Sequence, residues 1–81
     1  MTEREFAIDL GRRVQYARRM ARMAQHELGA GVGVHRVTIS RLETGQLVAS
    51  AWLLEACAVV LNVPLRALVP RTNPRFSTCS S

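Results

Sequence analysis

The sequence has few of the residues that build catalytic, metal or disulfide sites, with two cysteines and two histidines among 81 residues. Cys57 lies within an apolar helical pattern and Cys79 lies near the C-terminal end, so they do not form the disulfide framework of a small secreted domain. Together with His26 and His35, they also lack the spacing of metal ligands. No glycine-rich phosphate loop follows a strand pattern. We therefore expect neither an enzyme nor a protein with a metal or other cofactor.

Long apolar runs are also missing. The longest, residues 51–63, is interrupted by Glu55 and Asn62 and is too short to cross a bilayer. The first ten residues are acidic and have no apolar signal core. We therefore expect a cytoplasmic protein without a membrane partner.

Lysine is absent, so all eleven basic residues are arginines, and the net charge is +5. The guanidinium group suits bidentate contacts with phosphate and guanine, and a basic surface attracts nucleic acid in a salt-dependent way. A genome rich in G+C codons, or an ordinary solvated helix face, would explain the same pattern. Five arginines lie on the first predicted helix, within residues 10–22: Arg12, Arg13, Arg18, Arg19 and Arg22.

The most informative stretch of the chain reads QHELGAGVGVHRVTISRLETG. Its first part predicts a helix of about two turns over residues 25–32, followed by Gly33, where the helix end requires a positive φ. Its second part predicts a helix over residues 35–44 with Ile39 and Leu42 on the inner side. Two short helices joined this tightly form a helix-turn-helix unit, whose second helix enters a DNA major groove.

Hydrophobic spacing and capping residues predict three further helices. The first begins after Thr2, which has capping-box spacing to Glu5. The fourth begins after Ser50 and ends at Asn62, which can adopt a left-handed conformation there, and the short fifth helix begins at Pro64. The side chains expected to point inward from these helices are Phe6, Leu10, Val14, Ala17, Ala21, Leu53, Leu54, Cys57, Ala58, Leu61, Leu65 and Leu68.

The length of the chain allows one domain. We expect an all-α fold, a compact five-helix bundle over residues 1–69. Residues 70–81 contain Pro, Ser, Thr and Asn without periodicity and are expected to form a flexible C-terminal tail. A domain of this size buries only about 60% of its unfolded surface, so association with a second copy would help to stabilise it.

Many positions between residues 10 and 69 match the pattern of one known family at the right spacing. They are Leu10, Gly11, Arg18, Gln25, Leu28, Gly33, Val34, the run from Thr38 to Glu43, Gly45, Leu53, Leu54, Ala58, Leu61, Val63, Leu65 and Leu68. Through them the chain resembles the XRE family of helix-turn-helix proteins, which includes phage repressors and Cro. The resemblance implies a lambda-repressor-like DNA-binding domain with a role in transcription regulation.

The resemblance also implies which side chains meet DNA. Gln25 opens the second helix, where the family uses glutamine to bind a phosphate and brace the reading helix; an ordinary first-turn polar residue is the alternative. Arg36 and Arg41 are the expected base readers, because a guanidinium binds O6 and N7 of guanine together, although either could bind phosphate instead. Val37 could contact a thymine methyl group. The complete expected DNA-binding set is Gln25, His35, Arg36, Val37, Thr38, Ser40, Arg41 and Thr44.

Two structural features follow from the same resemblance. The family places a partly buried ion pair between the first and third helices, and Arg18 and Glu43 occupy those positions. The second and third helices depart from the family pattern, because usual capping residues are missing and glycine, which costs about 1 kcal/mol relative to alanine within a helix, is frequent. The departures are Ala24, Gly29, Gly31 and His35.

Trp52, Val59 and Val60 fall outside the inner stripe of the fourth helix and would form an exposed apolar patch on a monomer. Similar small repressors pair through their last two helices. We therefore expect a homodimer that binds an inverted repeat. The alternative for Trp52 is that it only covers the loop at residues 46–49.

These inferences together predict a sequence-specific regulator that binds double-stranded DNA, a transcriptional repressor or controller protein that reads its operator through residues 35–44. The alternative is an antitoxin-like protein-binding module whose DNA binding is secondary. In that case the tail, with Arg71, Arg75 and Phe76, would engage a second protein.

Overall fold

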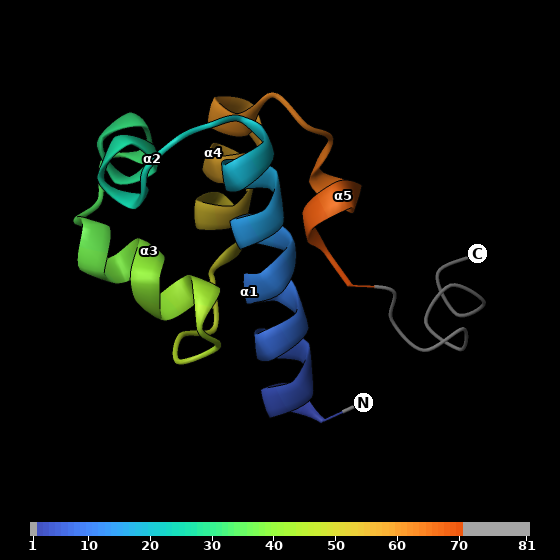
Figure 1. Ribbon diagram of the computed structural model, residues 1–81. Helices are drawn as coiled ribbons and strands as arrows, with labels where there is room; N and C mark the ends of the chain where they lie inside the picture. The colour runs from blue at the N-terminus through green and yellow to red at the C-terminus, as the bar shows by residue number, and fades with distance from the viewer. Residues whose placement is uncertain (1, 71–81) are drawn as a thin grey trace.

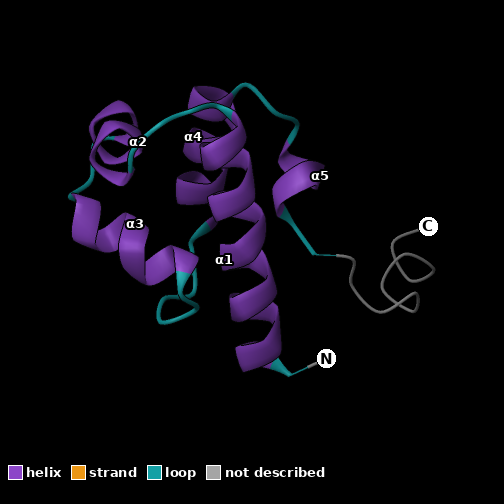
Figure 2. Cartoon of the chain, viewed as in Figure 1, coloured by secondary structure: helices purple, strands orange, loops and turns teal. Residues whose placement is uncertain are grey.

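The computed structural model describes residues 2–70 of the chain. This part contains five helices joined by loops and no strands (Figures 1 and 2). The expected all-α fold of five helices is confirmed. Met1 and residues 71–81 lie outside the described part, so the predicted tail is outside it except for Pro70, which is fully buried and belongs to the bundle. In chain order the helices are α1 (Glu3–Met20), α2 (Gln25–Val32), α3 (Arg36–Glu43), α4 (Ala51–Leu61) and α5 (Leu65–Leu68).

The start of α1 agrees with the predicted capping box. Thr2 Oγ1 accepts a hydrogen bond from the Glu5 amide at 3.1 Å, and Glu5 Oε1 accepts one from the Thr2 amide at 3.2 Å. Hydrogen bonding of the Glu5 carboxylate to the side chain and to the backbone amide of Thr2 lowers the pKa of this carboxyl group. The helix ends at Met20, so Ala21 is exposed at the turn and does not belong to the buried stripe, where the sequence pattern placed it.

The turn between α2 and α3 depends on two glycines. Gly33 ends α2 with a φ of 92°, as predicted. At Gly29 an added Cβ would lie 2.7 Å from the Val34 carbonyl oxygen, so only glycine lets the chain pass this close to α2. α3 is one residue shorter at each end than predicted, because His35 and Thr44 are its caps.

α4 ends at Asn62, which adopts the predicted left-handed conformation with a φ of 57°. Ser50 precedes the helix, but its side chain makes no capping hydrogen bond. α5 is a single turn of four residues, and one turn can bury only one side. Leu68 is therefore fully buried, whereas Leu65 is 43% exposed, which corrects the expectation that both point inward.

All five helices contribute side chains to the core, with α2 packed on α3 and α4, and α1 packed on α3, α4 and α5. α1 and α3 touch at Gly11, where an added Cβ would lie 2.7 Å from the Glu43 carbonyl oxygen and closer still to that of Leu42. No helix within residues 2–70 combines the length and the apolar character needed to cross a membrane. The buried core residues are Leu10, Val14, Leu28, Ile39, Leu42, Leu53, Cys57, Ala58, Leu61 and Leu68.

Candidate nucleic-acid interface

The outward side of α3 gathers most of the residues expected to bind DNA. Ile39 and Leu42 are fully buried, as predicted, so the opposite side of the helix faces solvent. All of the expected residues except Gln25 lie on α3 or at its caps. His35, Arg36, Val37, Arg41 and Thr44 are exposed, while Gln25, Thr38 and Ser40 are half-buried.

Arg36 and Arg41 stand at the two edges of this surface. At 100° per residue they are about 140° apart around the helix, with Val37 and Ser40 between them. Both guanidinium groups are exposed, and the ion pairs present within residues 2–70 involve other arginines. The two arginines therefore keep all their N–H donors for an external acceptor.

His35 caps α3 with its side chain. Its Nδ1 accepts a hydrogen bond from the Val37 amide at 3.1 Å, which replaces the serine or threonine hydroxyl expected at this position. Since Nδ1 is the acceptor, the neutral ring carries its proton on Nε2. The ring is exposed, so this remaining donor faces outward beside the start of α3.

Thr44 has a more structural role than the sequence suggests. Its hydroxyl group donates to the Ser40 carbonyl oxygen at 2.9 Å and approaches the Arg41 carbonyl oxygen at 3.3 Å. In this structure the hydroxyl proton satisfies a carbonyl oxygen at the end of α3. Thr38 and Ser40 make no such capping bond and keep their hydroxyl donors.

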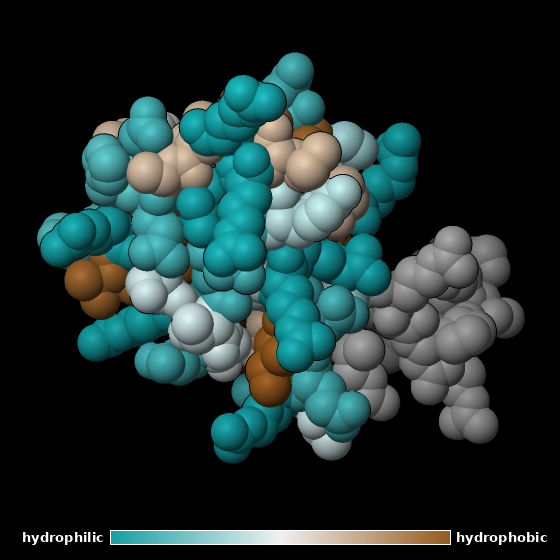
Figure 3. All heavy atoms as spheres, in the orientation of Figure 1, coloured by the Kyte–Doolittle hydropathy of each residue, from teal (hydrophilic) through white to brown (hydrophobic). Residues whose placement is uncertain are grey.

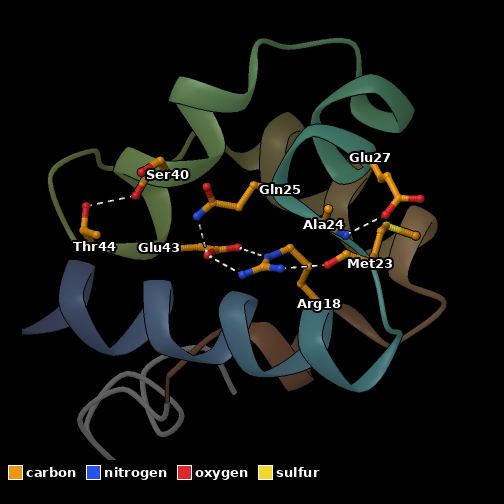
Figure 4. Close-up of polar contacts among 8 residues, drawn as sticks. All are labelled: Arg18, Met23, Ala24, Gln25, Glu27, Ser40, Glu43 and Thr44. Atoms are coloured by element: carbon orange, nitrogen blue, oxygen red, sulfur yellow. Dashed lines mark hydrogen bonds and ion pairs between the residues drawn. The ribbon is translucent and has the colours of Figure 1, made fainter.

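A buried polar network holds α3 against α1 and α2 (Figure 4). Arg18 Nε donates to Glu43 Oε2 at 2.6 Å and Arg18 Nη2 donates to Oε1 at 3.1 Å, which is the ion pair that the resemblance implied. Arg18 Nη1 also donates to the Met23 carbonyl oxygen at 2.7 Å. Gln25 Nε2 completes the network by donating to Glu43 Oε1 at 3.0 Å. The carboxylate of Glu43, the last residue of α3, is thus shared by both neighbouring helices.

The bond from Gln25 bears on its expected phosphate contact. Its amide nitrogen has two N–H donors, and Glu43 takes one of them. The second donor remains, on a side chain that is half-buried at the first position of α2. Ala24, which precedes Gln25, has no side chain that can cap the start of α2. Glu27 compensates in part, because its Oε1 accepts a hydrogen bond from the Ala24 amide at 2.8 Å.

The arginines of α1 do not form a single basic face. Arg18 is buried in the ion pair, whereas Arg12 and Arg13 line a groove between α1 and α5 that also contains Tyr16 and Met20. Figure 1 places α3 and α5 on opposite sides of α1, so this groove is turned away from α3. Arg22 lies beyond the end of α1 at Met20 and has a φ of 57°, so it is not on this helix as predicted. Hydrophilic side chains cover much of the face turned to the viewer in Figure 3.

One basic residue near α3 escapes sequence reasoning. Arg4, within the acidic beginning of the chain, lines the same hollow as Thr44 and Gln46 at the end of α3. Its position follows from helical spacing, since Arg4, Ile8 and Gly11 share one face of α1. The pattern could have indicated this only once Gly11 was known to touch α3.

The apolar surface of α4 is smaller than predicted. Trp52 is 59% exposed and Val59 is 76% exposed, so both face solvent. Val60 does not: it is half-buried, and its side chain packs over Gly31, where an added Cβ would lie 3.0 Å from Val60 Cγ1. The sequence could not indicate this, because Val60 lies at the edge of the inner stripe of α4. Its burial depends on the position of α2. Leu65 adds to the exposed apolar surface.

Cys57 is part of the core and has no accessible surface. Burial, with a smaller contribution from the nearby Glu43 carboxylate, raises the pKa of its thiol to about 11. The thiol is therefore neutral near pH 7 and packs as a small apolar side chain.

Comparison with known proteins agrees with this geometry. Residues 9–71 match a family model described as a helix-turn-helix domain. The chain is similar in fold to the restriction-modification controller protein C.AhdI from Aeromonas hydrophila, with a TM-score of 0.74 and 24% identity over 76% of this chain and 94% of that one. It is also similar to the DNA-binding domain of BldD, with a TM-score of 0.76 and 22% identity over 86% of this chain and 100% of that one.

A third similar structure is the hypothetical transcription factor NHTF from Neisseria, with a TM-score of 0.78 and 20% identity over 96% of this chain and 90% of that one. No curated protein sequence matches the chain. Since the family match covers well over half of the sequence, the chain belongs to the helix-turn-helix domain family, in agreement with its resemblance to XRE-type proteins.

Proposed function

We propose that this protein is a sequence-specific transcriptional regulator that binds double-stranded DNA through α3. The observation that carries the proposal is the pair of exposed, unpaired arginines, Arg36 and Arg41, on the outward side of a helix held from behind by a buried ion pair. Such guanidinium groups suit O6 and N7 of guanine. Two proteins of similar fold are a restriction-modification controller protein and a DNA-binding domain, which supports a role as a repressor or controller.

Within this proposal, base reading and phosphate binding fall to different residues. Arg36 and Arg41 read bases, and Val37, which is 44% exposed between them, contacts a thymine methyl group. Gln25 uses its second amide proton for a backbone phosphate, while its first holds Glu43. A phosphate bound there would fix α2 and α3 on the duplex together, since both meet at Glu43.

The test is to select bound sites from random duplexes with the wild-type protein and with Arg36→Ala and Arg41→Ala. Each arginine variant should lose discrimination at its own base pair, by about 1–3 kcal/mol, because a bidentate guanine contact is removed. Gln25→Ala should instead weaken binding to all sites alike, because a phosphate contact carries no sequence information.

Arg66→Ala is the matched control, because Arg66 is an exposed arginine on α5 and its loss changes the net charge equally. It should leave the base preference unchanged. Unchanged preference in both Arg36→Ala and Arg41→Ala would show that these residues do not read bases.

We also propose that the protein is a homodimer with α4 at its two-fold interface, which would match an inverted-repeat operator. Trp52 leaves more than half of its surface in solvent, so covering the loop at residues 46–49 does not account for it. Together with Val59 and Leu65 it forms apolar surface on α4 and α5 that a second copy would bury.

Trp52→Ser should raise the dimer dissociation constant about tenfold or more, since tryptophan is a frequent hot spot in interfaces. Sedimentation equilibrium measures this directly. Tyr16→Ser is the control, because Tyr16 is 68% exposed but lies on α1. Equal effects of the two substitutions, or no effect of either, would contradict an interface at α4.

The antitoxin-like alternative depends on Arg71, Arg75 and Phe76, which lie outside the described residues. No feature of residues 2–70 favours it over DNA binding. Since Pro70 packs into the bundle, we place the end of the DNA-binding domain at this residue, one position beyond the predicted boundary.

A further inference from the structure

α1 continues past the end of α3, and this extension carries a basic residue. Gly11 touches the last turn of α3 through the Glu43 carbonyl oxygen, and Ile8 packs on Gly45, where an added Cβ would lie 2.7 Å from Ile8 Cγ1. Arg4 lies one helical turn before Ile8 on the same face of α1. It therefore stands just beyond the end of α3, beside the loop that begins at Gln46. Figure 1 shows the start of α1 and this loop at the same end of the molecule.

Arg4 borders a hollow that reaches the C-terminal cap of α3. The hollow measures about 590 Å³, and Thr44, the cap of α3, belongs to its wall. The Arg4 side chain is exposed and takes no part in the ion pairs found within residues 2–70. The full lining is Glu3, Arg4, Ala7, Ile8, Thr44, Gly45, Gln46 and Val48.

We propose that Arg4 binds a backbone phosphate of the duplex whose bases α3 reads, so that α1 clamps the DNA beyond the end of the reading helix. This inference rests on the proposed function. The residues of the recognition helix contact base edges, so the segment that follows the helix, beyond Arg41, lies nearer the sugar-phosphate backbone. The planar guanidinium suits a phosphate, and the loop after α3 offers no other cation, because Gln46, Leu47 and Val48 are uncharged.

Glu3 lies beside Arg4 in the same hollow and opposes a bound phosphate. The affinity for DNA should therefore respond in opposite directions to the removal of these two charges. Removal of the Arg4 charge should weaken DNA binding, and removal of the Glu3 charge should strengthen it. A general effect of net charge predicts the same two signs, so a second exposed arginine of α1, away from α3, is needed to separate it from a direct contact.

The experiment measures the affinity of the full chain for its selected duplex over a series of KCl concentrations, with Arg4→Ala and Arg12→Ala compared. Both substitutions remove one exposed arginine from α1, but Arg12 lines the groove beside α5. Arg4→Ala should weaken binding about tenfold, equally for all operator variants, and should lower the slope of log K against log salt by about one. Arg12→Ala should leave the slope unchanged. Glu3→Gln should tighten binding.

Each other outcome overturns the proposal. Equal losses for Arg4→Ala and Arg12→Ala would mean that Arg4 acts only through long-range attraction. A loss confined to one base pair would make Arg4 a base reader, and an unchanged slope would exclude a phosphate contact. If the wild-type protein binds no duplex, the proposed function fails as well, which separates that case from the others. Thermal unfolding of Arg4→Ala should match the wild type, because the side chain is exposed.

Discussion

Replacing Glu43 with alanine is expected to lower the free energy of unfolding by about 3–5 kcal/mol. The substitution leaves the guanidinium group of Arg18 without its carboxylate partner in a site where the Arg18 side chain is only 11% exposed. It also removes the acceptor of the Gln25 amide, so α3 loses its polar attachment to α1 and to α2 at once. Urea unfolding followed by circular dichroism measures the change.

Asp9→Ala serves as the control for this prediction. Asp9 pairs with Arg13 at 3.4 Å, but both side chains are 38% exposed, so this pair should contribute less than about 1 kcal/mol. The double substitution Arg18→Met with Glu43→Leu should be less damaging than Glu43→Ala alone, because no buried charge is then left unpaired. A loss below about 1 kcal/mol for Glu43→Ala would show that Arg18 finds water or another acceptor.

The second large effect is expected from Gly11→Ala, which should cost about 3 kcal/mol or more of stability. The new methyl group would meet the backbone carbonyl oxygens of Leu42 and Glu43, which cannot rotate away as a side chain can. α1 and α3 would have to separate, and the ion pair behind them would be stretched. Gly11 lies within a helix, so the helix propensity of alanine offsets this by only about 1 kcal/mol.

Gly31→Ala tests whether the effect comes from the backbone contact. Gly31 also lies within a helix, but an added Cβ there would meet the end of the Val60 side chain at 3.0 Å, which can shift. The free energy of unfolding of the Gly31→Ala variant should differ from that of the wild type by less than about 1 kcal/mol in either direction. If thermal unfolding gives the two variants similar stabilities, the close approach of α1 to α3 is not what constrains Gly11.

Several elements could be predicted from the sequence because their causes are local. The capping box at Thr2, the left-handed residues Gly33 and Asn62, and the inward positions of Ile39 and Leu42 each depend on residues within about one helical turn. The helix-turn-helix pattern is of the same kind, and the family match agrees with it. Spacing and capping chemistry are therefore enough to place these features.

The errors occur where a residue lies at the boundary of an element or of a face. Ala21 has the spacing of the buried stripe, but α1 ends one residue earlier. The sequence pattern predicts Leu65 in the core and Val60 in an exposed patch. The exposure of each depends instead on how much of its surface a neighbouring helix covers. Hydrophobic spacing reports the angle of a side chain around its helix and not the position of the next helix.

The amino-acid sequence by itself thus determined the five helices, the capping box at Thr2 and the arginines on the outward side of α3, since these follow from interactions between residues a few positions apart. Only the tertiary structure decided that Gln25 shares Glu43 with Arg18, that Arg12 and Arg13 turn away from α3, and that Arg4 stands at its end. These relations join residues far apart in the sequence, such as Arg4 and Gln46, which are 42 positions apart. They depend on how closely helices pack, which is set by backbone contacts such as that at Gly11.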